Sequence, residues 1–386
     1  MRLATEEEIR SGKTTDIYFE RTRQILETLG VHRRVTVDVK TSGLPEGYPW
    51  GVLAGMDDAL GLLEGLPVDV EAMEEGTIFR AGDPVMQITG DYLDFGVLET
   101  AILGYICEQS GIATKSARFK KAAGDRQVIS FGARRMHPAL VPVIERNAYI
   151  GGCDGVSTVL AADLMGIEPS GTMPHALILM LGSVQEATRR FDEIIDPSVP
   201  RVALVDTLCD EKFESLAAAE AIGEKLAGVR LDTPGSRRGN MAKILDEVRW
   251  ELDLRGFAHV KLIVSGGIDE SDIPVLNAHC DGYGIGTSIA NARTVDFALD
   301  IIEIDGKPFC KRGKLSGRKQ VLRCDTCLGS IVVPHDYHRQ LLACPCSGVR
   351  AELLKPALES GKRLHPPKSI TEVREYVRGE VGKCGM

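Results

Sequence analysis

Short apolar runs alternate with amphipathic stretches through the middle of the chain. Runs of this kind predict buried strands, and they lie at Val128–Phe131, Arg201–Val205, Val229–Leu231, Lys261–Val264 and Gly282–Ile285. Helical spacing is found over residues 138–150, 156–165, 176–193, 211–226, 240–254 and 272–278. Alternation of this kind indicates parallel βα units. Because a polar or glycine-rich cluster ends each strand, we predict an α/β fold in which residues 111–295 form an irregular or incomplete (β/α) barrel.

The two ends of the chain follow a different pattern. Residues 35–40 alternate valine with polar residues, as a half-buried strand does, and residues 52–63 and 94–122 show helical spacing. Residues 1–110 are therefore expected to form an α+β N-terminal domain with an antiparallel sheet, joined by the C-terminal segment. In that segment, residues 296–386, Asp305-Gly306 predicts a hairpin turn and Ser369 predicts the cap of a last helix.

Composition and charge narrow the class of protein. Of the 386 residues, 44% are hydrophobic and 26% are charged, which excludes a wholly disordered chain. No apolar run is long enough to span a bilayer, and the first residues lack the apolar segment of a secretory signal. We therefore expect a cytoplasmic enzyme without a membrane partner. With 46 Lys and Arg against 55 Asp and Glu, the net charge of −9 argues against nucleic acid as a partner.

Two glycine clusters follow the last two predicted strands. They have the sequences SGGID at residues 265–269 and GIGTS at residues 284–288. Glycine lets the backbone approach a ligand closely, and successive N–H groups form a site for an anion. The alternative is a pair of tight turns. Two such clusters at the end of a βα series favour a phosphate site that includes Ser265, Gly266, Gly267, Gly286 and Thr287.

Aromatic and basic side chains follow the first predicted strand. Phe131 offers a face to an aromatic ring, and the paired guanidiniums of Arg134 and Arg135 suit a carboxylate or a phosphate. Taken alone, two adjacent arginines are equally compatible with a solvated surface pair. Their position directly after an apolar strand favours a ligand.

A histidine and two aspartates lie at other predicted boundaries. His175 precedes an apolar helix, where the dipole favours the neutral imidazole that a base or nucleophile requires. A half-buried histidine with a backbone partner is the alternative. Asp206 and Asp232 follow strands, where carboxylates bind ribose hydroxyls or Mg²⁺, or cap the following helices. Arg237 and Arg238 add positive charge nearby.

Four of the ten cysteines have the spacing of a metal site. Cys324 and Cys327 are separated by two residues, and Cys344 and Cys346 by one. Four thiolates on two short knuckles predict a closed, structural zinc site. The C-x-C pair departs from the usual C-x-x-C, and His335 and His338 between the pairs are reserve ligands.

Together these motifs resemble nicotinate phosphoribosyltransferase, within the wider family that includes the quinolinate and nicotinamide enzymes. The resemblance covers residues 10–300 and follows the order TTDIYFERT, GIATKSARF, SFGARR, GGCDGVST, SGTMPHA and VRLDT, and then the glycine clusters. It implies catalytic roles for His175, Arg134 and Asp232. The substrate-binding residues that it implies, besides those of the phosphate site, are Tyr18, Lys115, Arg118, Phe131, Arg135, Asp154, Thr172, Asp206 and Arg230.

The reaction that the resemblance implies joins nicotinate to phosphoribosyl pyrophosphate in NAD biosynthesis. Tyr18 from a neighbouring subunit and Phe131 would hold the pyridine ring, so a homodimer or a higher oligomer is expected. Mg²⁺ would neutralise the leaving pyrophosphate, and ATP hydrolysis would phosphorylate His175. Ala176 departs from the family, in which many members carry Glu or Ser there. The alternatives are a quinolinate phosphoribosyltransferase and a zinc-ribbon-bearing protein that binds another phosphorylated ligand.

Overall fold

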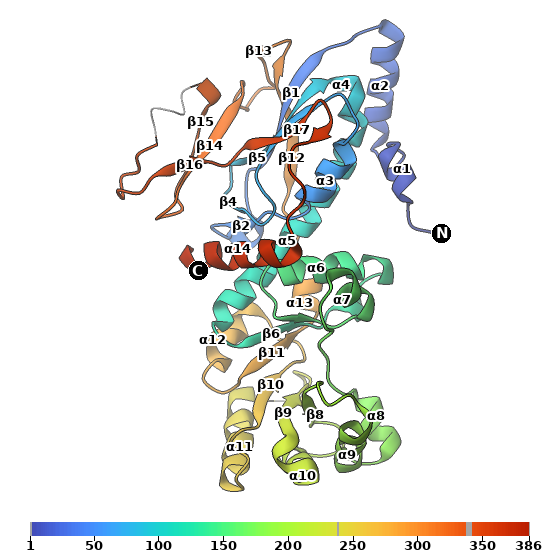
Figure 1. Ribbon diagram of the computed structural model, residues 1–386, viewed down its shortest axis with the longest axis vertical. Coiled ribbons are helices and arrows are strands. Elements are labelled where there is room, and N and C mark those ends of the chain that lie inside the picture. Colours follow the sequence, from blue (N-terminus) through green and yellow to red (C-terminus); the bar gives the residue numbers. More distant parts are fainter. Residues whose placement is uncertain (1, 238, 337–341, 386) are drawn as a thin grey trace. The chain divides into compact units, whose positions relative to one another are not determined.

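The computed structural model describes residues 2–237, 239–336 and 342–385. The chain divides into two compact units, one formed by residues 1–114 and 293–386 and the other by residues 115–292 (Figure 1). The boundary falls within one helix, α5 (Glu99–Ala123), and directly after another, α13 (Thr287–Ala290). Within the described residues, no helix combines the length and apolarity that crossing a lipid bilayer requires.

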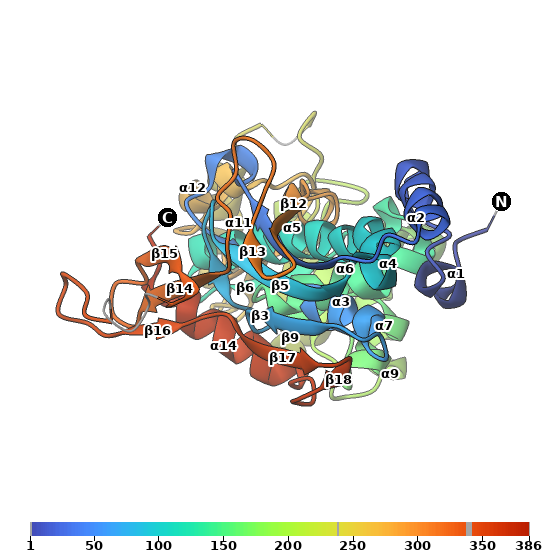
Figure 2. The same ribbon diagram turned by 90° about the horizontal axis from the view of Figure 1, so that it is seen from above.

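The first unit is built on a seven-stranded antiparallel sheet whose strands come from the N-terminal and the C-terminal parts of the chain. In sheet order the strands are β13 (Lys307–Pro308), β12 (Phe297–Ile304), β1 (Arg34–Thr41), β5 (Pro84–Asp91), β3 (Asp69–Ala72), β17 (Lys355–Glu359) and β18 (Lys362–Arg363). Figure 2 shows β17 and β18 beside β3, far from it in sequence. The helices of this unit are α1 (Glu6–Arg10), α2 (Ile17–Leu29), α3 (Met56–Leu63), α4 (Tyr92–Phe95) and α14 (Ile370–Lys383).

The alternating strand at residues 35–40 is confirmed, but it is buried on both faces. Val35, Val37 and Val39 enter the apolar core, as the pattern predicts. Asp38 on the opposite face is fully buried, and its carboxylate accepts a hydrogen bond of 2.7 Å from Lys319 Nζ. Lys319 begins β14 (Lys319–Cys324), which pairs with β15 (Ser330–Pro334) and β16 (Arg350–Glu352) in a second sheet. A buried ion pair therefore takes the place of solvent on the polar face.

Local signals in the C-terminal segment are confirmed. Asp305 and Gly306 have φ values of 51° and 71° in the turn between β12 and β13, the left-handed conformation that a two-residue hairpin requires. Ser369 caps α14 by accepting a hydrogen bond of 3.3 Å from the amide of Glu372, whose carboxylate accepts from the Ser369 amide at 2.8 Å. Reciprocal bonds of this kind satisfy amides that the first turn of a helix leaves open.

The second unit is a parallel α/β half-barrel, which confirms the predicted fold class. Its strands, in sheet order, are β7 (Gly155–Val156), β6 (Gln127–Ser130), β11 (Gly282–Ile285), β10 (Lys261–Val264), β9 (Leu226–Leu231) and β8 (Arg201–Leu204). Every neighbouring pair is parallel. The helices between strands are α6 (Val141–Ile150), α7 (Val159–Met165), α8 (His175–Leu181), α9 (Val184–Ile194), α10 (Glu211–Ile222), α11 (Met241–Leu254) and α12 (Ile273–Leu276).

Two features of this unit differ from the sequence-based expectation. Strand β7 was not predicted, because two residues are too short to give a periodic signal. The helix expected over residues 176–193 is two helices, since Gly182 ends α8 in the left-handed conformation and the Ser183 side chain caps α9. The first of the two helices, α8, begins at His175.

Candidate active site

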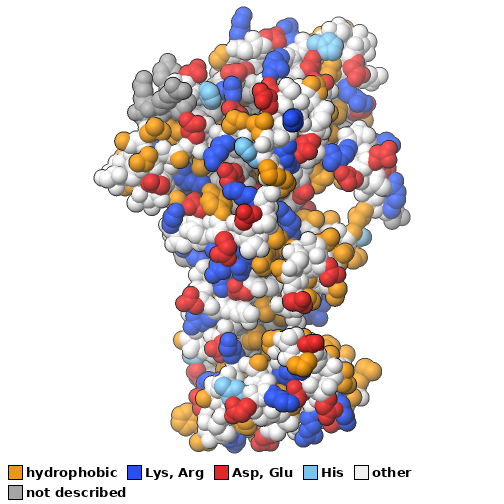
Figure 3. Space-filling model, viewed as in Figure 1, with side chains coloured by type: hydrophobic (Ala, Val, Ile, Leu, Met, Phe, Trp, Pro, Cys, Tyr) orange, Lys and Arg blue, Asp and Glu red, His pale blue; other side chains and the backbone are white. Residues whose placement is uncertain are grey.

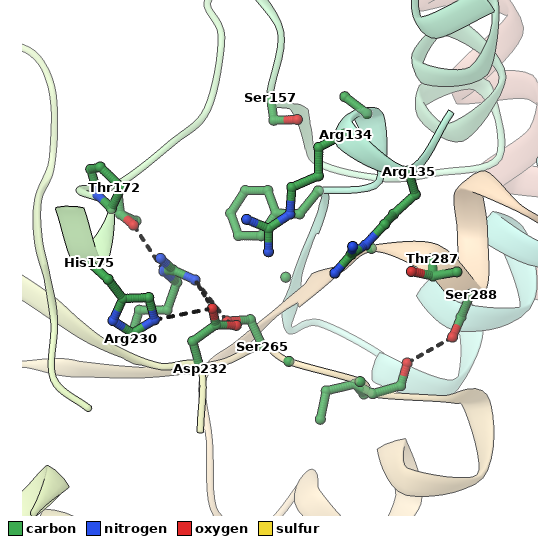
Figure 4. A pocket seen from close by; sticks show the side chains of 18 of the residues that line it. Arg134, Arg135, Ser157, Thr172, His175, Arg230, Asp232, Ser265, Thr287 and Ser288 are labelled. Atoms are coloured by element: carbon green, nitrogen blue, oxygen red, sulfur yellow. Dashed lines mark hydrogen bonds and ion pairs between the residues drawn. The ribbon is translucent and has the colours of Figure 1, made fainter. Parts of the chain in front are cut away.

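A pocket of about 390 Å³ lies at the carboxyl ends of β6, β9, β10 and β11 (Figure 4). This is the edge at which parallel α/β folds bind their ligands. Its lining includes fifteen of the residues that the sequence singles out as substrate-binding, catalytic or part of a glycine cluster: Phe131, Arg134, Arg135, Thr172, His175, Arg230, Asp232, Ser265, Gly266, Gly267, Ile268, Gly284, Gly286, Thr287 and Ser288. Residues from separate strand ends therefore meet in one concave site.

Glycine is sterically required at two points of the pocket wall. A Cβ atom at Gly266, where φ is +86°, would lie 2.7 Å from the carbonyl oxygen of Asp232. A Cβ atom at Gly284 would lie 2.3 Å from the Phe131 ring. The bare backbone at Gly284 thus lets the Phe131 ring pack directly against strand β11 and remain at the pocket surface.

Hydrogen bonds from Arg230 connect several residues of the pocket wall. Its side chain is mostly buried and donates to Thr172 Oγ1 and to Ser265 Oγ, each at 2.9 Å. Ser265 in turn donates to an Asp232 carboxylate oxygen at 2.6 Å, and Arg230 Nη1 lies 3.5 Å from the other oxygen. Burial lowers the pKa of Arg230, and the charge of Asp232 opposes that shift. Arg230 is therefore already engaged with the protein and fixes the loop that precedes His175.

His175 begins α8 and faces two carboxylates. Its Nε2 atom lies 3.7 Å from Asp232 Oδ2 and 4.0 Å from Asp206 Oδ2, and its Nδ1 atom lies 3.0 Å from Thr207 Oγ1. Burial raises the pKa of Asp206 to about 6, with His175 opposing the shift and Asp232 adding to it. The imidazole thus lies beside two carboxylates, whose oxygens are of the kind that bind a metal ion.

Arg134 and Arg135 supply the unengaged positive charge of the pocket. Both lie on a single 3₁₀ turn, η3 (Ala133–Arg135), directly after β6, and Figure 4 shows their guanidinium groups directed toward the cavity. Within the described parts of the chain, neither guanidinium has a hydrogen bond or ion pair to another side chain. These groups are available for an anionic ligand, and bidentate guanidinium contacts suit carboxylates and phosphates.

Other basic residues that the sequence singles out lie outside the pocket lining. Lys115 and Arg118 are buried, and both contact the Glu270 carboxylate, Lys115 Nζ at 3.4 Å and Arg118 Nε at 3.2 Å. Glu270 begins a 3₁₀ turn, η6 (Glu270–Asp272), next to the first glycine cluster. In this structure the two cations therefore anchor the loop of the predicted phosphate site. Arg237 is exposed, and Arg238 lies outside the described residues.

Three further predicted residues are placed elsewhere. Asp154 accepts a hydrogen bond of 2.8 Å from Lys120 and one of 3.0 Å from the amide of Val128, so it secures the start of β6. Asp206 is not part of the pocket lining but lies behind His175, with its side chain 3% exposed. Tyr18 belongs to the first unit, in the first turn of α2, and is 56% exposed.

Residues that sequence reasoning did not single out also shape the site. Ser157 lines the pocket, and Thr207 contacts His175. The buried Glu145 accepts hydrogen bonds from the amides of Ser157 and Thr158, at 2.9 and 3.0 Å. The only local signal was a polar residue after each short strand, which is too common a feature to select these positions.

The four predicted cysteines form a cluster in the first unit. Their sulfur atoms all lie within 4.8 Å of one another, with Cys324 and Cys346 3.4 Å apart and Cys327 and Cys344 3.7 Å apart. Tetrahedral zinc with four thiolates places sulfur atoms about 3.8 Å apart. Hydrogen bonding by the Cys327 backbone lowers the pKa of Cys324 to about 7, whereas the pKa of Cys346 is raised, because its hydrogen bonds with the other three cysteines outweigh the lowering by the Gly348 backbone. The geometry is compatible with zinc. His335 contacts Glu71 and Asp336 instead, and His338 lies outside the described residues.

A parallel half-barrel with a glycine-lined pocket and unengaged guanidiniums at its strand ends defines an enzyme of phosphorylated substrates. Residues 16–110 match the family described as quinolinate phosphoribosyl transferase, N-terminal domain, and residues 112–300 match its C-terminal domain. The chain belongs to the quinolinate phosphoribosyl transferase family and is a phosphoribosyltransferase.

Individual relatives extend the comparison. A nicotinate phosphoribosyltransferase of Mycobacterium tuberculosis is 31% identical over 337 residues, which cover 81% of this chain and 68% of the relative. A crystal structure of nicotinate-nucleotide pyrophosphorylase from Pyrococcus furiosus is 53% identical, with a TM-score of 0.97 and coverage of 99% of this chain and 98% of that one. Human nicotinic acid phosphoribosyltransferase shares the fold, with a TM-score of 0.73 at 19% identity, over 96% of this chain and 94% of the human one.

Proposed function

We propose that this protein is a nicotinate phosphoribosyltransferase of NAD biosynthesis, which forms nicotinate mononucleotide and pyrophosphate. The observation that carries the proposal is the position of His175 at the pocket, between Asp232 and Asp206. A quinolinate enzyme is driven by the loss of carbon dioxide from its substrate, whereas transfer to nicotinate has no such step. A histidine that accepts a phosphoryl group from ATP supplies the missing driving force.

The pocket's positive charge also supports a monocarboxylate. Arg134 and Arg135 are the two pocket guanidiniums without protein partners among the described residues, while Arg230 is engaged with Asp232, Thr172 and Ser265. Both the ring carboxylate and the pyrophosphate of the donor require positive charge. Quinolinate, with two adjacent carboxylates, would require a denser basic pocket than these two groups provide.

The transfer itself needs positioning more than a protein nucleophile. The pyridine nitrogen attacks the anomeric carbon of the donor, and the bond from that carbon to the pyrophosphate oxygen breaks. Phe131 offers its face to the ring, and Arg134 orients the carboxylate. The backbone at Gly266, Gly267 and Gly286 surrounds the 5′-phosphate. Negative charge that develops on the departing pyrophosphate is met by Arg135.

Two cofactors follow from this proposal. The oxygens of Asp206 and Asp232, both within 4.0 Å of His175 Nε2, are of the kind that Mg²⁺ prefers, so these two residues would hold the ion. Bound there, Mg²⁺ would neutralise phosphate charge. ATP is the phosphoryl donor to His175.

Zinc at the four cysteines would be structural, because four thiolates leave no position for a substrate.

Quinolinate phosphoribosyltransferase is the second candidate. The matching family carries the quinolinate name, and the Pyrococcus furiosus structure, 53% identical, is titled nicotinate-nucleotide pyrophosphorylase. The same ring-stacking face and phosphate site would serve this reaction, with decarboxylation as an added step.

Pyrophosphate release separates the two candidates. The protein is incubated with phosphoribosyl pyrophosphate, Mg²⁺ and either nicotinate, quinolinate or nicotinamide, each with and without ATP. Of the three pyridines, we expect only nicotinate to be converted, and we expect ATP to stimulate its conversion. The His175→Gln variant should lose the stimulation by ATP. Turnover with quinolinate alone, accompanied by release of carbon dioxide, would assign the second function instead.

A further inference from the structure

The two glycine clusters contain three hydroxyl side chains, which are not equally available to a ligand. Ser288 Oγ donates a hydrogen bond of 3.0 Å to the carbonyl oxygen of Ile268 and so connects the two clusters. Thr287 is exposed at the pocket, and within the described residues its hydroxyl has no hydrogen-bond partner. Ser265, in contrast, is only 2% exposed. Of the three hydroxyl groups, that of Thr287 is therefore the most accessible to a phosphate.

Strand pairing places Ser265 beside Asp232. In the parallel pair of β9 and β10, Leu231 lies opposite Val264, so the next residues, Asp232 and Ser265, lie side by side at the strand ends. The amide of Ser265 donates to the carbonyl oxygen of Leu231 at 2.8 Å, which extends the pairing by one residue. Gly266 follows, where a Cβ atom would lie 2.7 Å from the Asp232 carbonyl oxygen and 3.2 Å from its Oδ1. The start of the first glycine cluster therefore packs on Asp232.

Ser265 Oγ is engaged with protein groups on both sides (Figure 4). A hydroxyl has one hydrogen to donate, and Asp232 Oδ1 lies 2.6 Å away, whereas the carbonyl oxygen of Leu231 lies 3.4 Å away. A guanidinium can only donate, so Arg230 Nη1, at 2.9 Å, uses a lone pair of Oγ. One carboxylate oxygen of Asp232 is thereby fixed, while its Oδ2 lies 3.7 Å from His175 Nε2. The hydroxyl of Ser265 thus determines how the Asp232 carboxylate is oriented.

We propose that Ser265 is a positioning residue, which orients the Asp232 carboxylate toward the ribose of the donor and does not bind the 5′-phosphate through its hydroxyl. The inference rests on the proposed function, in which Asp232 serves the phosphoribosyl donor together with Mg²⁺. It gives Ser265 a role other than the phosphate contact that its sequence motif predicts, and it leaves the hydroxyl of Thr287 for the phosphate. Because the carboxylate is already held in place, it needs no reorganisation when the donor binds.

Two compounds separate the contributions of phosphate and ribose without turnover. Inorganic phosphate tests the phosphate site alone, and ribose 5-phosphate adds the sugar hydroxyls. The dissociation constants of both are measured by isothermal titration calorimetry with the full-length protein in the presence of Mg²⁺. The ratio of the two constants gives the affinity that the ribose adds, and this added affinity is what an oriented Asp232 should supply.

The variants are Ser265→Ala, Asp232→Ala, the combination of both, and Thr287→Val in the phosphate site. Ser116→Ala is the matched control, because Ser116 is fully buried in α5 and its hydroxyl has no hydrogen-bond partner within the described residues. We expect Ser265→Ala to lower the affinity added by the ribose about fivefold, the effect of one lost hydrogen bond, and to leave binding of inorganic phosphate unchanged. Thr287→Val should weaken both compounds equally, and Ser116→Ala should weaken neither.

The double variant tests whether Ser265 acts through Asp232. It should bind ribose 5-phosphate as Asp232→Ala does, because the Ser265 hydroxyl has no further effect once the carboxylate is absent. Effects of the two changes that multiply would show that Ser265 acts independently, and would overturn the inference. A loss of phosphate affinity in Ser265→Ala as large as that in Thr287→Val would also overturn it. Circular dichroism verifies that each variant is folded.

The same measurements keep this inference apart from the proposed function. Both candidate reactions use the same donor, so turnover with quinolinate instead of nicotinate would overturn the proposed function and leave the role of Ser265 intact. Conversely, if Ser265→Ala weakens both compounds alike while the wild type converts nicotinate, the inference fails and the proposed function stands. A wild type that binds neither compound would overturn both.

Discussion

At the scale of single residues, the arginines of the pocket have two different roles: one binds other protein groups, and two are available to a ligand. Arg230 is mostly buried and donates to Thr172 and Ser265, so its removal would leave the loop before His175 without these hydrogen bonds. Arg134 and Arg135 are exposed at the end of β6. A substitution at Arg230 would therefore affect both the stability of the fold and ligand binding. A substitution at Arg134 should affect ligand binding alone.

We predict that Arg134→Ala lowers kcat/KM for the pyridine acid by about 10- to 100-fold, the loss of one charge-assisted hydrogen bond at about 1.5–3 kcal/mol. Thermal stability should remain unchanged, since Arg134 is exposed. Steady-state kinetics with varied nicotinate measures the effect. Arg134→Lys keeps the charge and loses the bidentate geometry, so it should recover only part of the activity. A value of kcat/KM within about threefold of the wild type for Arg134→Ala would contradict the assigned role.

Asp206 is expected to make the free energy of unfolding depend on pH. Burial raises its pKa from 3.8 to about 6 in the folded state. Between these values the folded protein keeps a proton on Asp206 that the unfolded chain has lost, so this group's contribution to stability falls as pH rises through about 4 to 6. Above this window the ionised carboxylate is destabilising in the fold.

The Asp206→Asn variant cannot ionise, and we expect its free energy of unfolding to rise relative to the wild type across this window. The difference should become constant above about pH 6. Chemical denaturation at a series of pH values measures it. A difference that does not depend on pH would show that Asp206 ionises normally.

At the scale of elements, the sequence was most informative where the signal was local. Five apolar runs became the strands β6, β8, β9, β10 and β11, and Ser369 caps α14 as its type predicts. Residues that close these strands meet in one pocket because parallel strands bring their carboxyl ends to one edge. The contacts of Lys115 and Arg118 with Glu270 were beyond this reasoning, since more than 150 residues separate the partners and many carboxylates compete.

The metal that we expect at the cysteine cluster can be removed with a chelator, which makes the site testable. Its two pairs lie between β14 and β15 and between β15 and β16, with Cys324 the last residue of β14, in a three-stranded sheet. We predict about one zinc per chain by elemental analysis, and a cooperative loss of stability when a strong chelator removes it. Cys324→Ser should lose the metal and lower the melting temperature by several degrees. Cys209→Ser, at an exposed cysteine outside the cluster, should do neither. A metal-free protein with unchanged stability would contradict the zinc site.

At the scale of the whole molecule, the first unit depends on pairings that local patterns do not carry. Strand β1 pairs with β12, and β3 pairs with β17, so the unit is complete only when both ends of the chain are present. On the face drawn in Figure 3, acidic and basic side chains are interspersed. Because the net charge is −9, attraction of an anionic substrate depends on local positive charge, such as that of the pocket arginines.

The last prediction concerns a site shared between two copies of the chain. Tyr18 lies in the first unit, on an exposed turn of α2, whereas Arg134 lies in the pocket of the second unit. If Tyr18 serves the pocket of a neighbouring subunit, Tyr18→Ala and Arg134→Ala damage the same site from different chains. In a mixed dimer one site then carries both changes and the other carries none.

Co-expression of the two variants with different affinity tags should therefore restore activity that neither possesses alone. Random pairing makes half of the dimers mixed, each with one intact site of two, so about a quarter of the wild-type activity is expected. Purification through both tags in succession should raise this to about half. Size-exclusion chromatography confirms that the mixed dimer forms. A mixed dimer that stays as inactive as its parents would show that Tyr18 acts within its own chain. A Tyr18→Ala homodimer with wild-type activity would show that Tyr18 does not contact the substrate.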